Sequence, residues 1–436
     1  MTDVKDQTKS GMDYRIAQWV KAFLPRPILN LIYRRQARSY IRSLKPSFDL
    51  TKKTILAINH FYDQDLRALE LACTDYNFVV VDGPRLARGA KLFFPDDVIQ
   101  LNARYEKAPE TDRLSWRFEC RLMFEQLNER FHIGLILLPS DTFWWVRELV
   151  TVGHEHGVKT VVIDKEGIIS PYDFDAAASR IAQMAPFISD HIFVWSDRQK
   201  LFWNKIGVSD DMITILGQPR SDLFHVEKPR DVDALFGTPR PIVTFFSYMA
   251  DAYIPIDAAV SEKLTWGAMR EQTHNEVYRL AEKFASYNFV IKAHPQQPDI
   301  EELRARYERD NLRVIGGSAV ANELIQRSEL IIAFQTTALI EAMFMGRRII
   351  YTYWSELLPR FEKDLLPFHD APGIYTAKSF AELRRVCEQF IAGDTAEFEF
   401  SSDVLSRRSR FVDEYLYRPD GNVCRRFFEM AGRFVK

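Results

Sequence analysis

The sequence has few cysteines, no long apolar run and almost no net charge. Its four cysteines are far apart and form no CxxC pair, so they predict neither a disulfide framework nor a zinc site and suit a reducing compartment. The longest uncharged apolar stretch, residues 330–340, is far shorter than the roughly 20 residues of a membrane span. Lys and Arg number 58 against 60 Asp and Glu, and this balance excludes a general nucleic-acid-binding protein.

The composition is that of an ordinary globular protein. With 436 residues, 47% hydrophobic and 27% charged, the chain has room for two to three domains at about 150 residues each. The first ten residues, MTDVKDQTKS, are polar and lack the apolar core of a secretion signal. We therefore expect a soluble, cytoplasmic protein of several domains.

Acidic residues are absent from residues 14–45, a segment rich in Arg and Lys. Its apolar residues recur at roughly helical spacing, with Pro25 and Pro27 interrupting the pattern. A basic helix with an apolar face can lie on an anionic membrane surface, or it can pack on its own domain with the basic face in water. Both interpretations stay open, and the first would place a cytoplasmic protein at the periphery of the inner membrane.

Short apolar runs rich in β-branched residues alternate with helical stretches such as residues 111–131. This pattern is typical of parallel strands that are buried on both faces and linked by helices. A polar stretch around residues 225–240 interrupts the pattern. The expected strands are 54–59, 77–82, 133–139, 159–164, 191–196 and 212–217 before the interruption, and 241–247, 288–293, 312–316, 330–334 and 347–353 after it. The sequence therefore predicts an α/β protein with two Rossmann-like, doubly wound domains that face a cleft, with ligands at the carboxyl ends of the strands.

The expected boundaries divide the chain into four parts. They are a basic amphipathic N-terminal segment (1–50), a first Rossmann-like domain (51–232), a second Rossmann-like domain (233–402) and a helical segment (403–436). The helical segment can pack against either domain.

A His-Pro pair follows the expected strand 288–293. The proline stops the strand and directs His294 into the cleft at the strand end, where an imidazole can hold a phosphate oxygen. Lys292 precedes the pair by two positions. The alternative is a histidine that only terminates a strand.

The next strand ends in Gln335, Thr336 and Thr337, and a helix with Glu341 follows. The threonines would lie at the helix N-terminus, where hydroxyls and backbone N–H groups bind phosphate well. Glu341 would lie one turn further on the same face and accept a hydroxyl of a ribose or sugar. The alternative is an ordinary helix cap with a solvated Glu, but the two clusters lie at successive strand ends, which favours a shared binding site.

In these clusters the sequence resembles glycosyltransferases of the two-Rossmann-domain (GT-B) architecture. More narrowly, it resembles bacterial capsule and surface-polysaccharide transferases and CDP-glycerol glycerophosphotransferases. The resemblance is carried by VIKAHP (290–295), SELIIAFQTTALIEAMFMGRRII (328–350), GQPRSDLF (217–224) and RPDGNVCRRFFEMA (418–431). It is clearest over residues 210–436 and weak before them, and the turn at 335–337 also resembles that of UDP-N-acetylglucosamine 2-epimerases.

The resemblance implies roles for particular residues. In such families the His-Pro pair and a Ser/Thr-rich turn followed by Glu bind the phosphates and ribose of a donor nucleotide, which suggests His294, Thr336, Thr337 and Glu341 here. The turn of these families is commonly Ser-rich, and Gln335 departs from that pattern.

Arg220 follows the expected strand 212–217, at the join between the domains. Gly217 permits a close backbone approach there, and the guanidinium can reach a phosphate in the cleft. The alternative is a simple turn in which Arg220 pairs with Asp222. Both remain open.

The first domain would then present the acceptor and the catalytic base. The candidate bases follow three expected strands. His60 and Asp63 follow strand 54–59, Asp141 follows strand 133–139, and Glu166 follows strand 159–164. Each can take a proton from an acceptor hydroxyl, and the sequence does not choose among them. Asp63 and Asp65 also have the DxD spacing of a metal-binding motif, but an aspartate that caps a helix is the more common reason for such residues at a strand end, so no metal is expected.

These observations predict a metal-independent glycosyltransferase that moves a sugar from a nucleotide-sugar to a glycan or lipid-linked acceptor of a bacterial capsule or lipopolysaccharide. The second domain would bind the donor, and no separate cofactor and no nucleic acid would be needed. Three alternatives remain, namely a CDP-glycerol-type glycerophosphotransferase, a UDP-sugar 2-epimerase and a non-catalytic scaffold bound to a membrane. The donor, the acceptor, the stereochemistry and the oligomeric state are not readable from the sequence.

Overall fold

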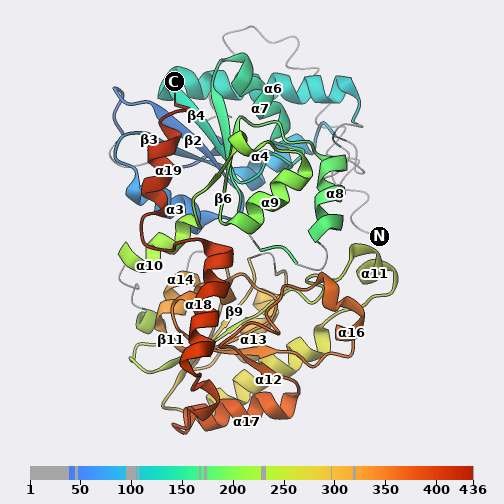
Figure 1. Cartoon of the computed structure of the whole chain (residues 1–436), viewed down its shortest axis with the longest axis vertical. Helices are drawn as coiled ribbons and strands as arrows, with labels where there is room; N and C mark the ends of the chain where they lie inside the picture. Colours follow the sequence, from blue (N-terminus) through green and yellow to red (C-terminus); the bar gives the residue numbers. More distant parts are fainter. Residues whose placement is uncertain are drawn as a thin grey trace.

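The structure is a computed structural model that describes residues 39–44, 48–94, 105, 108–165, 168–170, 174–226, 232–295, 297–317 and 321–435. Its strands form two separate β-sheets, each flanked by helices, and the two α/β domains lie one above the other along the long axis of the molecule (Figure 1). The predicted α/β architecture with two Rossmann-like domains is confirmed. The expected boundaries at residues 51, 233 and 403 stay predictions.

The first sheet has seven strands in the order β1-β3-β2-β4-β5-β6-β7. They are β1 (Ile41–Leu44), β2 (Thr54–Asn59), β3 (Asn77–Asp82), β4 (Ile133–Leu138), β5 (Lys159–Ile163), β6 (His191–Val194) and β7 (Ile213–Ile215). All neighbours are parallel except β1, which runs antiparallel to β3. The apolar runs predicted as strands in this half are therefore confirmed.

Strand β1 corrects the interpretation of the basic segment 14–45. Helix was expected there, but Ile41, Ser43 and Leu44 pair with β3. Hydrogen bonds to a neighbouring strand override the local helical spacing of apolar residues. Residues 14–38 and 45 lie outside the described part of the chain, and the expected membrane contact rests mainly on them.

The second sheet has six parallel strands in the order β10-β9-β8-β11-β12-β13. They are β8 (Ile242–Phe246), β9 (Asn288–Lys292), β10 (Leu312–Ile315), β11 (Ser328–Ala333), β12 (Arg348–Thr352) and β13 (Tyr375–Ala377). The sequence predicts all of them but β13, which consists of Tyr375, Thr376 and Ala377 and gives no apolar run rich in β-branched residues. Within the sheet the strand order corresponds to 3-2-1-4-5-6, the order of dinucleotide-binding domains, and it reverses between β8 and β11.

The α-helices that surround the sheets differ widely in length. They are α3 (Asp63–Ala72), α4 (Gly83–Ala90), α6 (Glu110–Phe131), α7 (Arg147–Glu155), α8 (Phe174–Met184), α9 (Asp197–Ile206), α10 (Leu223–Val226), α11 (Ile256–Ser261), α12 (Gly267–Lys283), α13 (Ile300–Tyr307), α14 (Ala321–Arg327), α15 (Ala338–Phe344), α16 (Leu358–Phe361), α17 (Phe380–Ile391), α18 (Ser402–Leu416) and α19 (Val423–Ala431). A short 3-10 helix, η3 (Pro219–Asp222), joins β7 to α10. Within the described residues, none of these helices is long and apolar enough to cross a membrane.

Strand β2 shows how the first sheet is buried on both faces. Ile55 and Ala57 belong to one apolar cluster with residues of α3 and α19, whereas Leu56 and Ile58 belong to a second cluster with residues of α6 and α7. All four side chains are fully buried. Because successive side chains of a strand point to opposite faces, a continuous apolar run is needed to fill both layers.

The end of the chain joins the two domains. Helix α18 contacts α15 and α9, and α19 returns to lie beside α3 in the first domain (red in Figure 1). The carboxylate of Asp222 in η3 accepts hydrogen bonds from the backbone N–H groups of Val423 (3.1 Å) and Cys424 (2.7 Å). These bonds satisfy donors at the start of α19 that have no partner within the helix. Helices α18 and α19 thus pack on both domains.

Gly217, just after β7, lies where the returning chain passes. Its φ is +99°, and a Cβ built there would be 2.6 Å from the backbone oxygen of Tyr417 and 3.0 Å from that of Leu416. Only glycine fits without movement of the backbone, because both the left-handed conformation and the close approach exclude a side chain.

The substitution Gly217→Ala should therefore lower the free energy of unfolding by more than about 2 kcal/mol, since it adds a backbone clash to the cost of an unfavourable φ. Chemical denaturation measures this change. Gly207→Ala is a matched control, because Gly207 has a φ of +105° but its Cβ would meet nothing within 4 Å. Equal losses in the two variants would contradict the packing role of Gly217.

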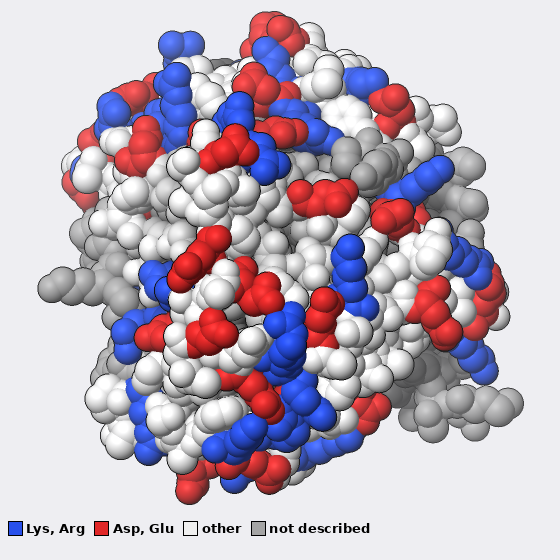
Figure 2. Space-filling view, turned by 60° about the horizontal axis from the view of Figure 1, so that its bottom comes forward, with Lys and Arg blue, Asp and Glu red and all other residues white. Residues whose placement is uncertain are grey.

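Charged side chains of both signs are mixed on the face in Figure 2, which turns the α17 end of the molecule toward the viewer. Ion pairs also link α12 to α17. Arg279 lies 2.5 Å and Lys283 3.1 Å from Glu388 of α17, and Arg279 also lies 2.5 Å from the buried Glu276 of its own helix. Charges of opposite sign thus neutralise each other between these two helices.

Candidate active site in the interdomain cavity

A cavity of about 210 Å³ lies between the two domains. The second domain lines it with residues that follow β8, β9 and β11, on both sides of the point where the strand order reverses. The first domain lines it with the start of α3, which follows β2, with Lys165, which follows β5, and with Arg220 in η3. Ligands of doubly wound domains bind at such strand ends, because the connections on either side diverge and leave a crevice.

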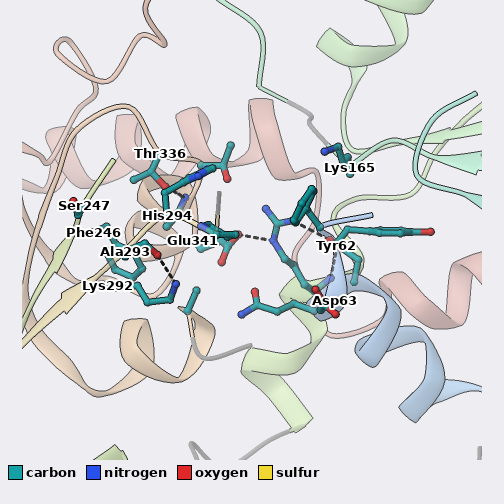
Figure 3. Close-up of a pocket in the computed structure, with 18 residues that line it drawn as sticks. Tyr62, Asp63, Lys165, Phe246, Ser247, Lys292, Ala293, His294, Thr336 and Glu341 are labelled. Atoms are coloured by element: carbon teal, nitrogen blue, oxygen red, sulfur yellow. Dashed lines mark hydrogen bonds and ion pairs between the residues drawn. The ribbon is translucent and has the colours of Figure 1, made fainter. Parts of the chain in front are cut away.

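The second-domain wall contains five of the residues predicted to bind a donor. They are Lys292, His294, Thr336, Thr337 and Glu341, and all line the cavity. In Figure 3, the labelled Lys292, His294 and Thr336 lie on one side of the pocket, facing Tyr62 and Asp63 on the other. The structure therefore brings together residues that are more than 40 positions apart in the sequence.

Lys292, the last residue of β9, is a buried cation in this wall. Its Nζ donates hydrogen bonds to the carbonyl oxygens of Ala293 (2.8 Å) and Gly317, and no carboxylate among the described residues forms an ion pair with it. Burial lowers the pKa of its amine to about 8, because removal of water disfavours the charged form. An anion in the cavity would give this ammonium group a partner of opposite charge.

Arg220 joins the domains beside the cavity. Its guanidinium donates to Oδ2 of Asp65 in α3 (2.9 Å) and to Oε1 of Glu341 in α15 (2.7 Å), and it lies over the ring of Trp195. Gln218 also donates to Oε1 of Glu341 (3.2 Å). Both carboxylates are buried, and together they raise the pKa of Arg220 above its usual value although burial opposes this.

The sequence left two interpretations of Arg220, namely a phosphate contact in the cleft and an ion pair with Asp222. The alternative pairing with Asp222 is wrong, because the carboxylate of Asp222 caps α19 instead. Arg220 and Glu341 both line the cavity, as predicted for donor binding, but they also bond each other. A phosphate or a ribose hydroxyl at this place would therefore contact Arg220 and Glu341 while they are bonded to each other.

Gln335 has a position that the sequence did not predict. It is buried at φ +45°, and its amide donates to Oη of Tyr351 (2.5 Å) and accepts from the backbone N–H of Leu366 (2.7 Å). It is not among the described residues that line the cavity. Its amide thus fixes the turn that carries Thr336 and Thr337, so any contact with a donor remains a prediction.

Ser247 lines the cavity, although the sequence pattern did not predict it as a site residue. It follows β8, and its Oγ is 3.0 Å from Nε2 of His274 in α12. Burial lowers the pKa of His274 to about 3, so the imidazole is neutral near pH 7 and holds the serine hydroxyl in place. The only sequence signal was a polar residue at the end of an apolar run.

The candidate bases occupy different places. Asp63 lines the cavity, and Nδ2 of Asn59 donates to its Oδ1 (2.9 Å). His60 packs among aromatic rings, with Phe143 at 4.8 Å and Trp145 at 5.2 Å between centroids.

Two further candidates lie elsewhere. Asp141 is fully buried, and its Oδ2 accepts from the backbone N–H groups of Ile188 (2.8 Å) and Ser189 (2.9 Å). Burial raises the pKa of this carboxyl, and these hydrogen bonds oppose the rise. Asp141 and His60 are not among the described residues that line the cavity. Glu166 lies outside the described residues.

The carboxylates of Asp63 and Asp65, which have the DxD spacing, form hydrogen bonds with different partners. Asp63 bonds Asn59 and Asp65 bonds Arg220. Throughout the described ranges, no three His, Cys, Asp or Glu side chains gather as metal ligands would.

No model of a protein family matches this sequence, and neither does any curated protein. Solved structures do have a similar fold. The wall teichoic acid polymerase TagF, in a CDPG soak, has a TM-score of 0.53 and 9% identity, covering 96% of this chain and 97% of that chain. A UDP-N-acetylglucosamine 2-epimerase has a TM-score of 0.50 and 13% identity, covering 88% and 97%. A putative UDP-N-acetylglucosamine 2-epimerase from Listeria monocytogenes has a TM-score of 0.50 and 11% identity over the same shares. At these identities the likeness shows the fold alone, and it confirms that the chain has the GT-B-like fold implied by its sequence motifs.

Proposed function

We propose that this protein is a glycosyltransferase that moves a sugar from a nucleotide-sugar donor to an acceptor of bacterial surface-polysaccharide synthesis. The observation that carries the proposal is the cavity in which Lys292, His294, Thr336 and Thr337 lie opposite the start of α3. The second domain would hold the donor, and the first domain would hold a glycan or lipid-linked acceptor. Residues 14–45 would keep the enzyme on the anionic cytoplasmic surface of the inner membrane.

The residues of the second-domain wall suit the charge that develops in such a transfer. When the bond between the sugar carbon and the phosphate oxygen breaks, negative charge grows on the departing diphosphate. The ammonium group of Lys292, the imidazole of His294 and the threonine hydroxyls would stabilise that charge in a partly desolvated site. Preorganised donors of this kind often supply the largest part of catalysis, and no metal ion is required for them to act.

A CDP-glycerol-type glycerophosphotransferase is the second candidate. It is favoured by the fold likeness to the wall teichoic acid polymerase TagF, which extends over 96% of this chain. Both candidates place a nucleotide diphosphate against the same wall, and they differ in the group that is transferred.

The substitution His294→Ala should lower turnover by roughly 100-fold or more while the fold stays intact, because it removes a donor to the departing phosphate. The assay measures release of UDP from UDP-glucose and UDP-N-acetylglucosamine, and of CMP from CDP-glycerol, with a bacterial surface-glycan fraction as acceptor. His225→Ala is the matched control, because His225 is exposed and bonds the backbone oxygen of Pro419.

Each outcome of this assay has a clear meaning. Release of UDP that depends on the acceptor supports the glycosyltransferase, and release of CMP from CDP-glycerol supports the second candidate. Conversion of a UDP-sugar without acceptor would indicate a 2-epimerase. Full activity of His294→Ala would contradict the site, and no turnover of any donor would indicate a scaffold.

A further inference from the structure

Asp63 lies at the point where the first domain meets the donor side of the cavity. It is the first residue of α3, it is half-buried, and it lines the cavity together with Lys292 and His294 from the second domain. Figure 3 shows Asp63 and Tyr62 opposite the labelled residues of the second-domain wall. If a donor lies on the second-domain wall and an acceptor lies between the donor and α3, a side chain at the start of α3 would face the acceptor.

The carboxylate of Asp63 is held in a defined orientation. Asn59, the last residue of β2, is buried, and its Nδ2 donates to Oδ1 of Asp63 at 2.9 Å. β2 adjoins β4, where the strand order of the first sheet reverses. The carboxylate is thus anchored to the rigid sheet rather than to a loop, as a group that must meet a reacting atom requires.

The other described carboxylates of the cavity have a different task. Asp65 accepts from Nη1 of Arg220 at 2.9 Å and, through its other oxygen, from the backbone N–H of Arg220 at 3.1 Å. Glu341 accepts from Nε of Arg220 at 2.7 Å. Hydrogen bonds from Arg220 thus engage both oxygens of Asp65 and Oε1 of Glu341, and these two carboxylates serve the contact between the domains.

We infer, on the basis of the proposed function, that Asp63 is the catalytic base that takes the proton of the acceptor hydroxyl. The acceptor oxygen forms the new bond to the sugar carbon as its proton passes to the carboxylate of Asp63. The bond between that carbon and the phosphate oxygen breaks, and the electron pair leaves with the nucleoside diphosphate against Lys292 and His294. The carboxylic acid of Asp63 then returns the proton to water.

The test compares acceptors that differ in their need for a base. An alcohol must lose a proton during transfer, whereas azide is already an anion and needs no base. The experiment measures release of UDP from UDP-glucose and UDP-N-acetylglucosamine by the full chain, with the surface-glycan fraction or with sodium azide as acceptor. Asp63→Asn keeps the size of the side chain, Glu166→Gln tests the other carboxylate candidate, and the exposed Asp75→Asn is the control.

Asp63→Asn should lower transfer to the glycan by roughly 100- to 10,000-fold, as expected for loss of a general base. Transfer to azide and the affinity for UDP should stay close to those of the unchanged protein. Equal loss with both acceptors would overturn the inference, because it would indicate a structural role. Full activity of Asp63→Asn, with loss in Glu166→Gln, would assign the base to Glu166 and leave the proposed function intact. A wild-type chain that releases no UDP with either acceptor would refute the proposed function itself, and the inference with it.

Discussion

Replacing Arg220 with alanine should lower the free energy of unfolding by about 3–5 kcal/mol, the range typical of a buried ion pair that loses one partner. The substitution would leave Asp65 and Glu341 buried without their cation, and both carboxylates are at least 97% buried in the structure. Because they belong to different domains, the loss should also loosen the contact between the domains. Chemical denaturation and small-angle scattering measure the two effects.

Arg425→Ala is the matched control for this prediction. Arg425 also bonds a glutamate, Glu429, at 2.7 Å, but both side chains are largely exposed. Exposed pairs typically contribute less than about 1 kcal/mol, because water and salt screen them. A loss of similar size in the two variants would show that the buried network around Arg220 does not hold the domains together.

Replacing Lys292 with methionine should weaken the binding of UDP or CDP by roughly 10- to 100-fold, the value of one charge-assisted hydrogen bond. The same change should not destabilise the unliganded protein. Methionine has a similar length, and it removes an ammonium group that is buried against carbonyl oxygens alone. Isothermal titration and chemical denaturation separate the two quantities, and the exposed Lys283→Met is the control.

The pH dependence of the same group gives a further check on this prediction. The pKa of Lys292 is about 8 in the folded protein, below its usual value of about 10.4 in an unfolded chain. Between these values the unfolded chain binds more protons, so stability should rise as the pH increases from about 8 to about 10.4. Nucleotide affinity should fall over the same range, because the ammonium group is lost. A pH profile of Lys292→Met that matches the unchanged protein would contradict both effects.

Much of the fold could be predicted from the sequence, because a strand that is buried on both faces of a sheet needs a nearly continuous apolar run. The runs at β2, β8 and β9 are mostly apolar and are buried along their whole length, and the structure shows each as a strand. The same signal is missing from β1 and β13, which form edges of their sheets and contain no apolar run. The edge strands β7 and β10 do contain apolar runs, and the sequence predicts both.

The second-domain wall was readable for a related reason. Lys292 ends a strand, His294 and Thr336 come two and three positions after strands, and parallel strands bring their carboxyl ends to one edge. The partners of Arg220 were not readable, because Asp65 precedes it by 155 positions and Glu341 follows it by 121. Pairings of that separation depend on how the domains meet.

The most direct test of the account is a calorimetric titration of the full chain with UDP, CDP, GDP and CMP, each with and without Mg²⁺. The account predicts that at least one nucleotide binds at a single site, with an affinity that Mg²⁺ does not change and that Lys292→Met weakens. Absence of binding by every nucleotide, or binding that is unaffected in Lys292→Met, would contradict the claim that the interdomain cavity is a nucleotide site.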